Sequence, residues 1–295
     1  MNDWHIAITG PTSGIGRSSS ITLAKMGARL SLLCRNLDKA AELQREILAK
    51  TGHQANIVEL DMASLASVRR AAEELLEQGQ PLDVLLNNAG VVNLKRKETV
   101  DGYEETLAVN HFAPFLLTGM LLPLLHEGGG GRIVNVASNA HAFVRSMRFE
   151  DMQAERNYSV FREYGRSKLA NILFTRSLAR RLRGTNLTVN TLHPGAVATA
   201  LGKNNPGAIS SLLPLLLRPF FLSPEQGAAT SIYLCSSDDV AEVSGKYFIK
   251  SKIATPRAWA QDDEAAERLW QFTERCVDFC YNVQGISGPD AAHTE

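Results

Sequence analysis

The stretch that decides the fold is Trp4-His5-Ile6-Ala7-Ile8-Thr9-Gly10-Pro11-Thr12-Ser13-Gly14-Ile15-Gly16. Residues 4–9 predict a short buried strand, and residues 17–26 have a helical pattern that Gly27 ends. A strand, a glycine turn and a helix form a dinucleotide site, because glycines let the backbone approach the pyrophosphate and the helix N-terminus offers N–H donors. The glycine spacing differs from the common G-x-G-x-x-G, so an ordinary tight connection is the alternative.

Apolar stretches that predict further strands recur along the chain, at 29–34, 56–60, 83–87, 132–137, 187–192 and 246–249. Amphipathic helical stretches lie between most of them. This alternation predicts a single α/β domain: a Rossmann-like, doubly wound parallel sheet of about seven strands with helices on both faces. The residues that follow the strands should then meet at one edge, and they include Gly10, Arg35, Asp61, Asn87, Ser138 and Pro194.

A phenol and an ammonium group lie four residues apart in Tyr164-Gly165-Arg166-Ser167-Lys168. On a helix this spacing puts both side chains on one face. A neighbouring cation favours phenolate and brings a tyrosine toward acid/base work at neutral pH. A Tyr and a Lys also occur at this spacing by chance, so the pair indicates an active site only together with the other motifs of the chain.

Four motifs together resemble the ordered motif set of the short-chain dehydrogenase/reductase (SDR) family: Thr9-Gly10-x-x-x-Gly14-Ile15-Gly16, Asn87-Asn88-Ala89-Gly90, Ser138 and Tyr164-x-x-x-Lys168. The resemblance covers about residues 3–250. Within the family, the stretches 107–112, 167–171 and 192–195 look most like the retinol dehydrogenase-like branch. It implies an oxidoreductase that interconverts a carbonyl and an alcohol by hydride transfer.

The resemblance also implies catalytic roles for four residues. Ser138 would donate a hydrogen bond to the substrate oxygen, and Tyr164 would deliver or remove the proton. Lys168 would lower the pKa of Tyr164 and bond the nicotinamide ribose. Asn110 would hold, through its main chain, a water that links Lys168 to solvent; a solvated polar position on its helix is the alternative.

The end of the second strand favours NADP(H) over NAD(H). An acid there bonds a ribose 2′-hydroxyl, whereas an Arg accommodates a 2′-phosphate. Here Arg35 follows the strand, with no acid before Asp38, and Arg17 offers a second guanidinium. Solvated surface charges are the alternative for both arginines. Asp61 resembles the position that bonds the adenine amino group; capping of the next helix with Ser64 is the alternative, and both roles are compatible.

The motifs and the resemblance assign cofactor contacts in several segments. Residues 87–90 resemble the segment that lines the adenine-ribose side and steadies the sheet. Residues 194–199 resemble a Pro-Gly-x-Val-x-Thr run, in which the Val197 main chain meets the carboxamide and Thr199 meets polar groups of the cofactor. The full set is Gly10, Thr12, Ser13, Gly14, Ile15, Gly16, Arg17, Arg35, Asp61, Met62, Asn88, Ala89, Gly90, Tyr164, Lys168, Pro194, Gly195, Val197 and Thr199.

An apolar segment, 209–222, is broken by two prolines and an arginine and is too short to span a bilayer. The resemblance implies a lid, at about 200–224 within a catalytic domain of residues 1–250, over a lipophilic and retinoid-like aldehyde, ketone or alcohol. A subunit contact or a patch resting on a membrane surface is the alternative. Residues 251–295 are expected to form a helical extension packed on the same domain.

Composition adds limits on compartment and partners. The chain has 295 residues, 44% of them hydrophobic, and its formal charge of zero gives no case for a nucleic acid or an anionic membrane. Four cysteines without metal-ligand spacing predict a reducing compartment and no metal site, with Cys276 and Cys280 on one face of a C-terminal helix. Residues 1–4 lack a signal or anchor pattern, so we expect a cytoplasmic protein. His111, His141 and His193 are expected in core or loop positions rather than as metal ligands.

Three functions stay open from sequence. The leading one is an NADP-dependent carbonyl reductase or alcohol dehydrogenase for a lipophilic molecule. The second is light-dependent reduction of a tetrapyrrole double bond, since protochlorophyllide reductases share the same motifs. The third is a non-catalytic NADP-binding sensor, against which the presence of all four catalytic residues argues. Homo-oligomerisation also stays open, because the lid and the C-terminal extension are placed to obstruct the contacts of tetrameric relatives.

Overall fold

A computed structural model describes residues 3–127, 129–195 and 222–283. Its sheet has eight strands in the order β3-β2-β1-β4-β5-β6-β7-β8, and the order reverses between β1 and β4. This is the doubly wound, Rossmann-like arrangement predicted from the sequence. The strands are β1 (His5–Thr9), β2 (Arg29–Cys34), β3 (Asn56–Glu59), β4 (Val84–Asn87), β5 (Arg132–Val136), β6 (Thr188–His193), β7 (Tyr247–Ile249) and β8 (Lys252–Ala254).

The eighth strand was not predicted, and it is the only described strand that runs antiparallel to its neighbour. A tight turn joins β7 to β8 through Lys250 and Ser251, whose φ angles are +51° and +58°. Glycine and asparagine usually occupy such left-handed positions. Because neither residue is present, the sequence carried no hairpin signal.

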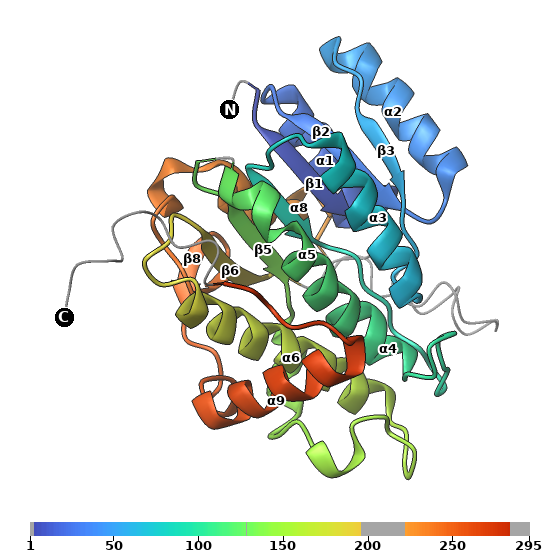
Figure 1. The fold of residues 1–295 in the computed structure, drawn as a ribbon, viewed down its shortest axis with the longest axis vertical. Helices are drawn as coiled ribbons and strands as arrows, with labels where there is room; N and C mark the ends of the chain where they lie inside the picture. Colours follow the sequence, from blue (N-terminus) through green and yellow to red (C-terminus); the bar gives the residue numbers. More distant parts are fainter. Residues whose placement is uncertain (1–2, 128, 196–221, 284–295) are drawn as a thin grey trace.

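Helices cover both faces of the sheet (Figure 1). One face carries α1 (Gly14–Lys25), α2 (Leu37–Thr51) and α8 (Pro224–Ser236), whereas the other carries α3 (Leu65–Gln78), α5 (Ala113–Glu127) and α6 (Val160–Arg181). Successive strand side chains alternate between the two cores, as a pleated strand requires. In β1, Ile6 and Ile8 enter the first core and Ala7 enters the second.

The most apolar helix is a core element of the second face. It comprises α4 (Glu105–Leu107), a π-helical turn η1 (Ala108–Phe112) and α5. Within the described residues, Glu105–Glu127 alone has the length and hydropathy of a membrane span, but 89% of its most apolar window is buried inside the fold. Burial against its neighbours is therefore sufficient to explain its composition.

The last described helix, α9 (Asp263–Val277), crosses the face formed by α5 and α6 (Figure 1). Trp270 packs its ring against Phe115, Phe174 and Tyr281, with ring centroids 4.6–5.9 Å apart. The Tyr281 hydroxyl donates to the Phe115 carbonyl at 2.6 Å. The extension thus completes the second core.

The prediction that Cys276 and Cys280 share a helix face is wrong. The helix ends at Val277, because Asp278 takes a left-handed φ of +47°. Cys280 lies beyond that point and is exposed, whereas Cys276 is half-buried.

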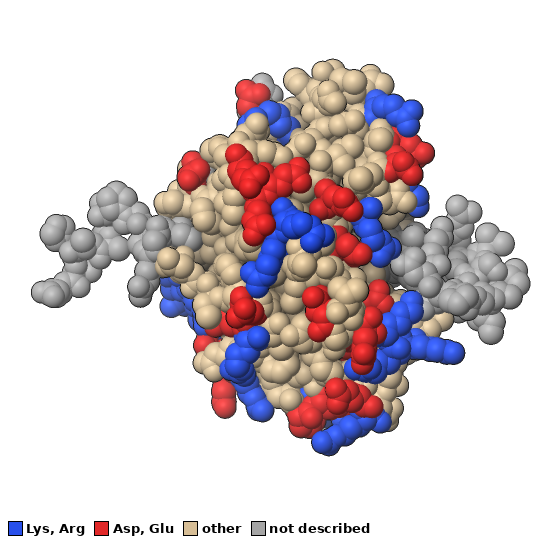
Figure 2. Space-filling model, turned by 45° about the vertical axis from the view of Figure 1, so that its right-hand side comes forward, with Lys and Arg blue, Asp and Glu red and all other residues tan. Residues whose placement is uncertain are grey.

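Acidic and basic side chains are interspersed on the face drawn in Figure 2, with no large area of one sign. Several form ion pairs along the α6 and α9 surfaces, such as Arg181 with Glu267 at 2.8 Å. On this face the charges are therefore mixed rather than gathered into a patch of one sign.

Trp270→Ala should lower the free energy of unfolding by about 3–5 kcal/mol, the usual cost of truncating a buried aromatic side chain. Urea unfolding measures this, and a single shifted transition would show that α9 unfolds with the rest of the domain. The matched control is Gln271→Ala, an exposed neighbour on the same helix, which should stay within about 0.5 kcal/mol. A wild-type transition for Trp270→Ala would contradict the packing described above.

Candidate active site

The glycine turn after β1 is shaped by close backbone contacts. Gly10 and Gly14 have φ angles of +63° and +50°, and a Cβ on Gly16 would lie 2.2 Å from the Gly10 carbonyl oxygen. Helix α1 begins at Gly14, three residues earlier than predicted, after Ser13 as N-cap. The Ser13 side chain makes no capping bond and the first turn holds no acidic residue, so neither competes with a ligand for the N–H groups at the positive end of this helix.

The second motif is bonded directly to the first. The Asn88 side-chain amide donates to the carbonyls of Thr9 and Gly10, at 2.9 and 3.2 Å. The Thr9 hydroxyl accepts the main-chain N–H groups of Asn88 and Ala89, both at 3.0 Å. These four bonds fix the loop after β4 against the glycine turn.

Asn87 steadies the centre of the sheet, the role implied for its segment. Its amide nitrogen donates to Thr118 of α5 and Asn135 of β5, both at 2.9 Å, and Asn135 donates in turn to Thr175 of α6 at 3.0 Å. All four side chains are buried. The network ties two strands to α5 and to α6, the helix that carries Tyr164 and Lys168.

The positions expected to select the cofactor lie at the surface beside the glycine turn. The Arg35 side chain is 66% exposed and lies 3.8 Å from Asp61, whereas Arg17 pairs with Glu46 of α2. Of the two roles expected for Asp61, the helix cap belongs to Ser64, which accepts the Ser67 N–H at 3.3 Å. Asp61 instead accepts the Ala63 N–H at 3.0 Å, and its second oxygen faces Arg35.

Tyr164 and Lys168 lie together on α6, with the Lys168 Nζ 5.6 Å from the centroid of the Tyr164 ring. The Nζ donates to the Val136 carbonyl at 3.0 Å, at the end of β5. Ser138 follows that strand, and a hydrogen bond joins its side chain to Tyr164. A phenol, an ammonium and a hydroxyl group therefore meet at the carboxyl edge of the sheet.

Asn110 completes this group from the π-helical turn, a distortion that occurs often at functional sites. Its side chain accepts the Val91 N–H at 2.8 Å and donates to the Ser167 hydroxyl at 2.9 Å. It is fully buried, so the alternative of a solvated position is wrong. A Cβ on Gly90 would lie 3.3 Å from the Asn110 amide oxygen and 3.5 Å from the Lys168 Nζ, so the loop after β4 reaches the catalytic group.

The electrostatics of the pair differ from the prediction. Burial raises the pKa of Tyr164, and its hydrogen bond with Ser138 acts in the opposite direction. Burial also lowers the pKa of Lys168 to about 8. Spacing alone predicted that Lys168 would lower the tyrosine pKa, but the ammonium is itself desolvated and directed at a carbonyl.

The remaining predicted contacts divide between described and undescribed residues. Pro194 and Gly195 follow β6, with φ +90° at Gly195. Thr12, Ile15 and Met62 lie on the loops and helix beside the glycine turn, with Ile15 and Met62 buried. Val197, Thr199 and the expected lid up to residue 221 lie outside the described residues.

Sequence reasoning missed several residues that hold the site. Asn135 and Thr118 gave no signal, because their roles depend on partners from other elements. His141 and His193 were expected in core or loop positions, yet each bonds the backbone beside Ser138. Only the topology, which places the ends of β5 and β6 side by side, brings these groups together.

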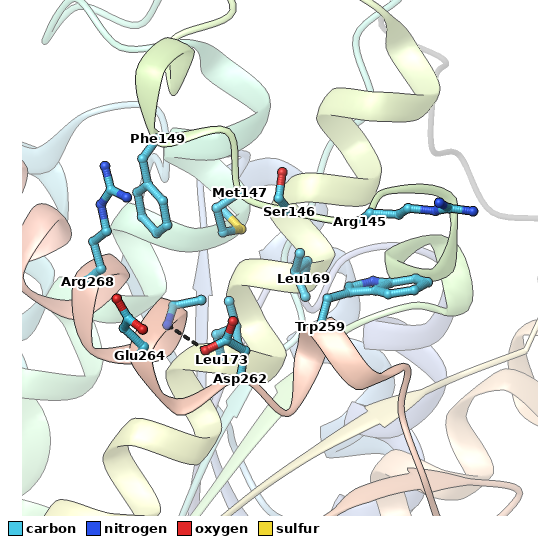
Figure 3. A pocket seen from close by; sticks show the side chains of 11 residues that line it. Arg145, Ser146, Met147, Phe149, Leu169, Leu173, Trp259, Asp262, Glu264 and Arg268 are labelled. Atoms are coloured by element: carbon cyan, nitrogen blue, oxygen red, sulfur yellow. Dashed lines mark hydrogen bonds between the residues drawn. The ribbon is translucent and has the colours of Figure 1, made fainter.

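Two cavities flank this region without containing the catalytic residues. One of about 250 Å³ lies between α6, α9 and the loop 145–149, where Phe149, Trp259 and Arg268 line it (Figure 3). The other, about 530 Å³, is lined by Asn139, His141 and Tyr247 among others and so begins directly beside Ser138. The geometry of the catalytic group, rather than the first cavity, locates the chemistry.

Comparisons with known proteins agree with this geometry. The family model described as short chain dehydrogenase matches residues 4–208. Retinol dehydrogenase 14 of Mus musculus is 44% identical over 94% of this chain and 86% of its own length, and retinol dehydrogenase 13 of Homo sapiens is 39% identical over 92% and 84%.

Among solved structures, a protein from Mycobacterium Paratuberculosis described as uncharacterized superposes with a TM-score of 0.78 at 30% identity, covering 95% of this chain and 96% of its own. A structure from Shigella flexneri, described as a short chain dehydrogenase complexed with NADP, gives a TM-score of 0.68 at 25% identity, covering 85% and 98%.

Lys168→Met should stabilise the protein at neutral pH. The folded state depresses the lysine pKa from 10.5 to about 8, so below pH 8 the buried charge costs about 3 kcal/mol, and this cost fades as the pH rises from 8 toward 10.5. Urea unfolding at several pH values should show wild-type stability rising relative to the variant over that window. Lys25→Met, at an exposed position of α1, is the control and should show no such difference. Parallel pH profiles for wild type and Lys168→Met would contradict the burial of a charged ammonium.

Proposed function

Because the chain belongs to the short-chain dehydrogenase family, we propose that it is an NADP(H)-dependent oxidoreductase that interconverts a carbonyl and an alcohol on a lipophilic, retinoid-like molecule. The observation that carries this proposal is the convergence of Ser138, Tyr164 and Lys168 at the carboxyl edge of the sheet, with Asn110 behind them. These groups come from three separate elements and share one location with the glycine turn.

The described residues fit a dinucleotide cofactor that carries a 2′-phosphate. The turn before α1 presents backbone N–H groups at a helix N-terminus without a competing acidic side chain. Arg35 is exposed after β2, and its ion pair within the described residues is a 3.8 Å contact with the partly exposed Asp61, so its guanidinium is accessible to a 2′-phosphate. When bound, the cofactor would supply or accept the hydride. Gly10, Asn88, Ala89 and Gly90 would line its path toward Lys168.

Ser138 and Tyr164 would handle the charge that develops on the substrate oxygen. The Ser138 hydroxyl donates a hydrogen bond to that oxygen, and the Tyr164 hydroxyl donates the proton during carbonyl reduction. Burial favours the neutral phenol, which is the form that reduction requires. Once the proton has left, the positive charge of Lys168, 5.6 Å from the ring centroid, would offset part of the cost of burying the phenolate.

The substrate class draws on two sources of support. The curated relatives at 39–44% identity are named retinol dehydrogenases, which motivates retinol and retinal for this chain. The strongly apolar sequence of residues 209–222 supports a lipophilic partner for the same site.

Purified protein should oxidise NADPH in the presence of retinal or another apolar aldehyde, and Tyr164→Phe should lower kcat by at least about 100-fold, the usual contribution of a positioned proton donor. NADPH affinity should stay within about twofold of the wild-type value, because the substitution removes the Tyr164 hydroxyl group but leaves the backbone of the glycine turn unchanged. Tyr233→Phe, on α8, is the control and should behave like wild type.

Full turnover by Tyr164→Phe would overturn the mechanism. Absence of turnover across the panel despite tight NADPH binding would overturn the carbonyl reaction. Illumination with protochlorophyllide would then separate pigment reduction from a sensor.

Arg35→Asp should lower the preference for NADPH over NADH, as the ratio of kcat/KM values, by about 10- to 100-fold. This is the effect of losing a charge-assisted hydrogen bond of about 1.5–3 kcal/mol. Arg45→Asp, on the outer surface of α2, makes the same charge change and should leave the ratio unchanged. Equal efficiency of wild type with both cofactors would refute the NADP assignment.

A further inference from the structure

The peptide group between Ser138 and Asn139 is held at both of its polar atoms by a histidine ring. The Ser138 carbonyl oxygen lies 2.8 Å from Nδ1 of His141, and the Asn139 N–H donates to Nδ1 of His193 at 3.2 Å. His141 comes three residues later in the chain, whereas His193 is the last residue of β6. The peptide that follows the candidate catalytic serine is thus clamped from two elements.

The partners fix the tautomer of His141. A carbonyl oxygen can only accept, so Nδ1 of His141 carries the hydrogen and Nε2 accepts. Nε2 does accept, from the Arg257 main-chain N–H at 3.3 Å, while the His141 carbonyl accepts the Trp259 indole N–H at 3.0 Å. The ring is 1% exposed and packs edge-on against Tyr247, with centroids 5.4 Å apart. The ring therefore has both nitrogens engaged and little freedom to turn.

The partner of His193 fixes the opposite tautomer. Because Nδ1 accepts the Asn139 N–H, the hydrogen must be on Nε2. Burial lowers the pKa of His193 to about 4, and the charge of His141 acts in the same direction. Burial is also the main cause that lowers the pKa of His141, against its bond to the Ser138 carbonyl, which raises it. Both rings are then neutral at neutral pH, as their acceptor nitrogens require.

The clamped peptide controls where the Ser138 hydroxyl points. The hydroxyl oxygen accepts the Ala140 N–H at 3.1 Å, and this N–H belongs to the peptide group that directly follows the clamped one. Rotation of the peptide would move this donor and release the hydroxyl from the direction in which it meets Tyr164. A hydrogen-bond donor that drifts from the position of the developing charge loses most of its effect on the reaction.

We propose that His141 and His193 are positioning residues, which hold the Ser138–Asn139 peptide so that the Ser138 hydroxyl is oriented toward the substrate oxygen. The role rests on the proposed oxidoreductase function. Neither ring touches the reacting atoms, and each acts through the backbone of the serine.

Paired substitutions at each histidine test this role by steady-state kinetics. His193→Leu removes the acceptor, whereas the side-chain oxygen of His193→Asn can take the place of Nδ1. His141→Leu removes the donor, whereas the amide of His141→Asn can still donate to the Ser138 carbonyl. Each Leu variant should lower kcat by about 10- to 100-fold, part of the loss expected for removing such a donor outright. The KM for the carbonyl and the affinity for NADPH should change by less than about threefold, and each Asn variant should recover most of kcat.

The same substitutions in a Ser138→Ala background separate positioning from general damage. If the histidines act through the serine hydroxyl, they should have almost no further effect once it is absent, because residues that act as a unit are non-additive. His53→Leu, at an exposed histidine after α2, is the control and should match wild type. Nitrogen-15 NMR of histidine-labelled protein should show the Nδ1–H tautomer for His141 and the Nε2–H tautomer for His193.

Three results would overturn the proposal: unchanged kcat in both Leu variants, an equal loss in Leu and Asn variants, or a loss that persists in the Ser138→Ala background. The opposite tautomer at either ring would overturn the proposal independently of activity. This NMR measurement uses the wild-type protein, so it can be made even if a Leu variant folds poorly. Wild-type protein without carbonyl turnover would overturn the proposed function and, with it, the positioning role. Wild-type turnover that depends on Ser138 but not on the histidines would leave the function standing and refute the clamp alone.

Discussion

Asparagine side chains that are buried or half-buried join the backbone segments at the carboxyl edge of the sheet, where the candidate catalytic groups lie. An amide offers donors and an acceptor from one side chain, so it can join two backbone segments that have no ladder between them. Asn88 joins the glycine turn to the loop after β4, and Asn110 joins the π-helical turn to Val91 and Ser167. Breaking such a bond inside the protein leaves a buried partner unpaired, at about 1–3 kcal/mol each. These bonds consequently hold the loops at this edge in place, where the hydrogen bonds of the parallel sheet have ended.

That rigidity lets the fold keep groups that are unfavourable for stability. The buried Lys168 ammonium lies 5.6 Å from the ring centroid of the half-buried Tyr164, and desolvation disfavours the ionised form of each group. An isolated helix would turn such side chains to solvent, but α6 is covered on one side by the sheet and on the other by α9. Side chains that lower stability in this way concentrate at functional sites, because the packing of the surrounding core compensates for their cost.

The sequence was sufficient wherever a residue's role follows from its own neighbours along the chain. The sequence predicts seven strands, the glycine turn and the Tyr164–Lys168 pair because apolar runs, glycine spacing and helical spacing are local properties. Three features could not be read in this way. The β7–β8 turn uses Lys250 and Ser251 where glycine or asparagine is usual, and the pKa of Tyr164 depends on burial, which spacing does not encode. His193 bonds Asn139, 54 residues away, and His141, although it bonds the nearby Ser138 carbonyl, is fixed at its other nitrogen by Arg257, 116 residues away.

The C-terminal helix connects the stability of the fold to this site. His111 sits in the same π-helical turn as Asn110, and its ring bonds the Thr273 hydroxyl of α9 at 3.0 Å. Trp270 of the same helix packs on Phe174, six residues after Lys168 on α6. A segment that follows the sheet in sequence therefore contacts both helices that carry catalytic groups. Because α9 covers the α5 and α6 face with the chain's own residues, this face is part of the domain core, and the order of the site depends on the C-terminal helix staying docked.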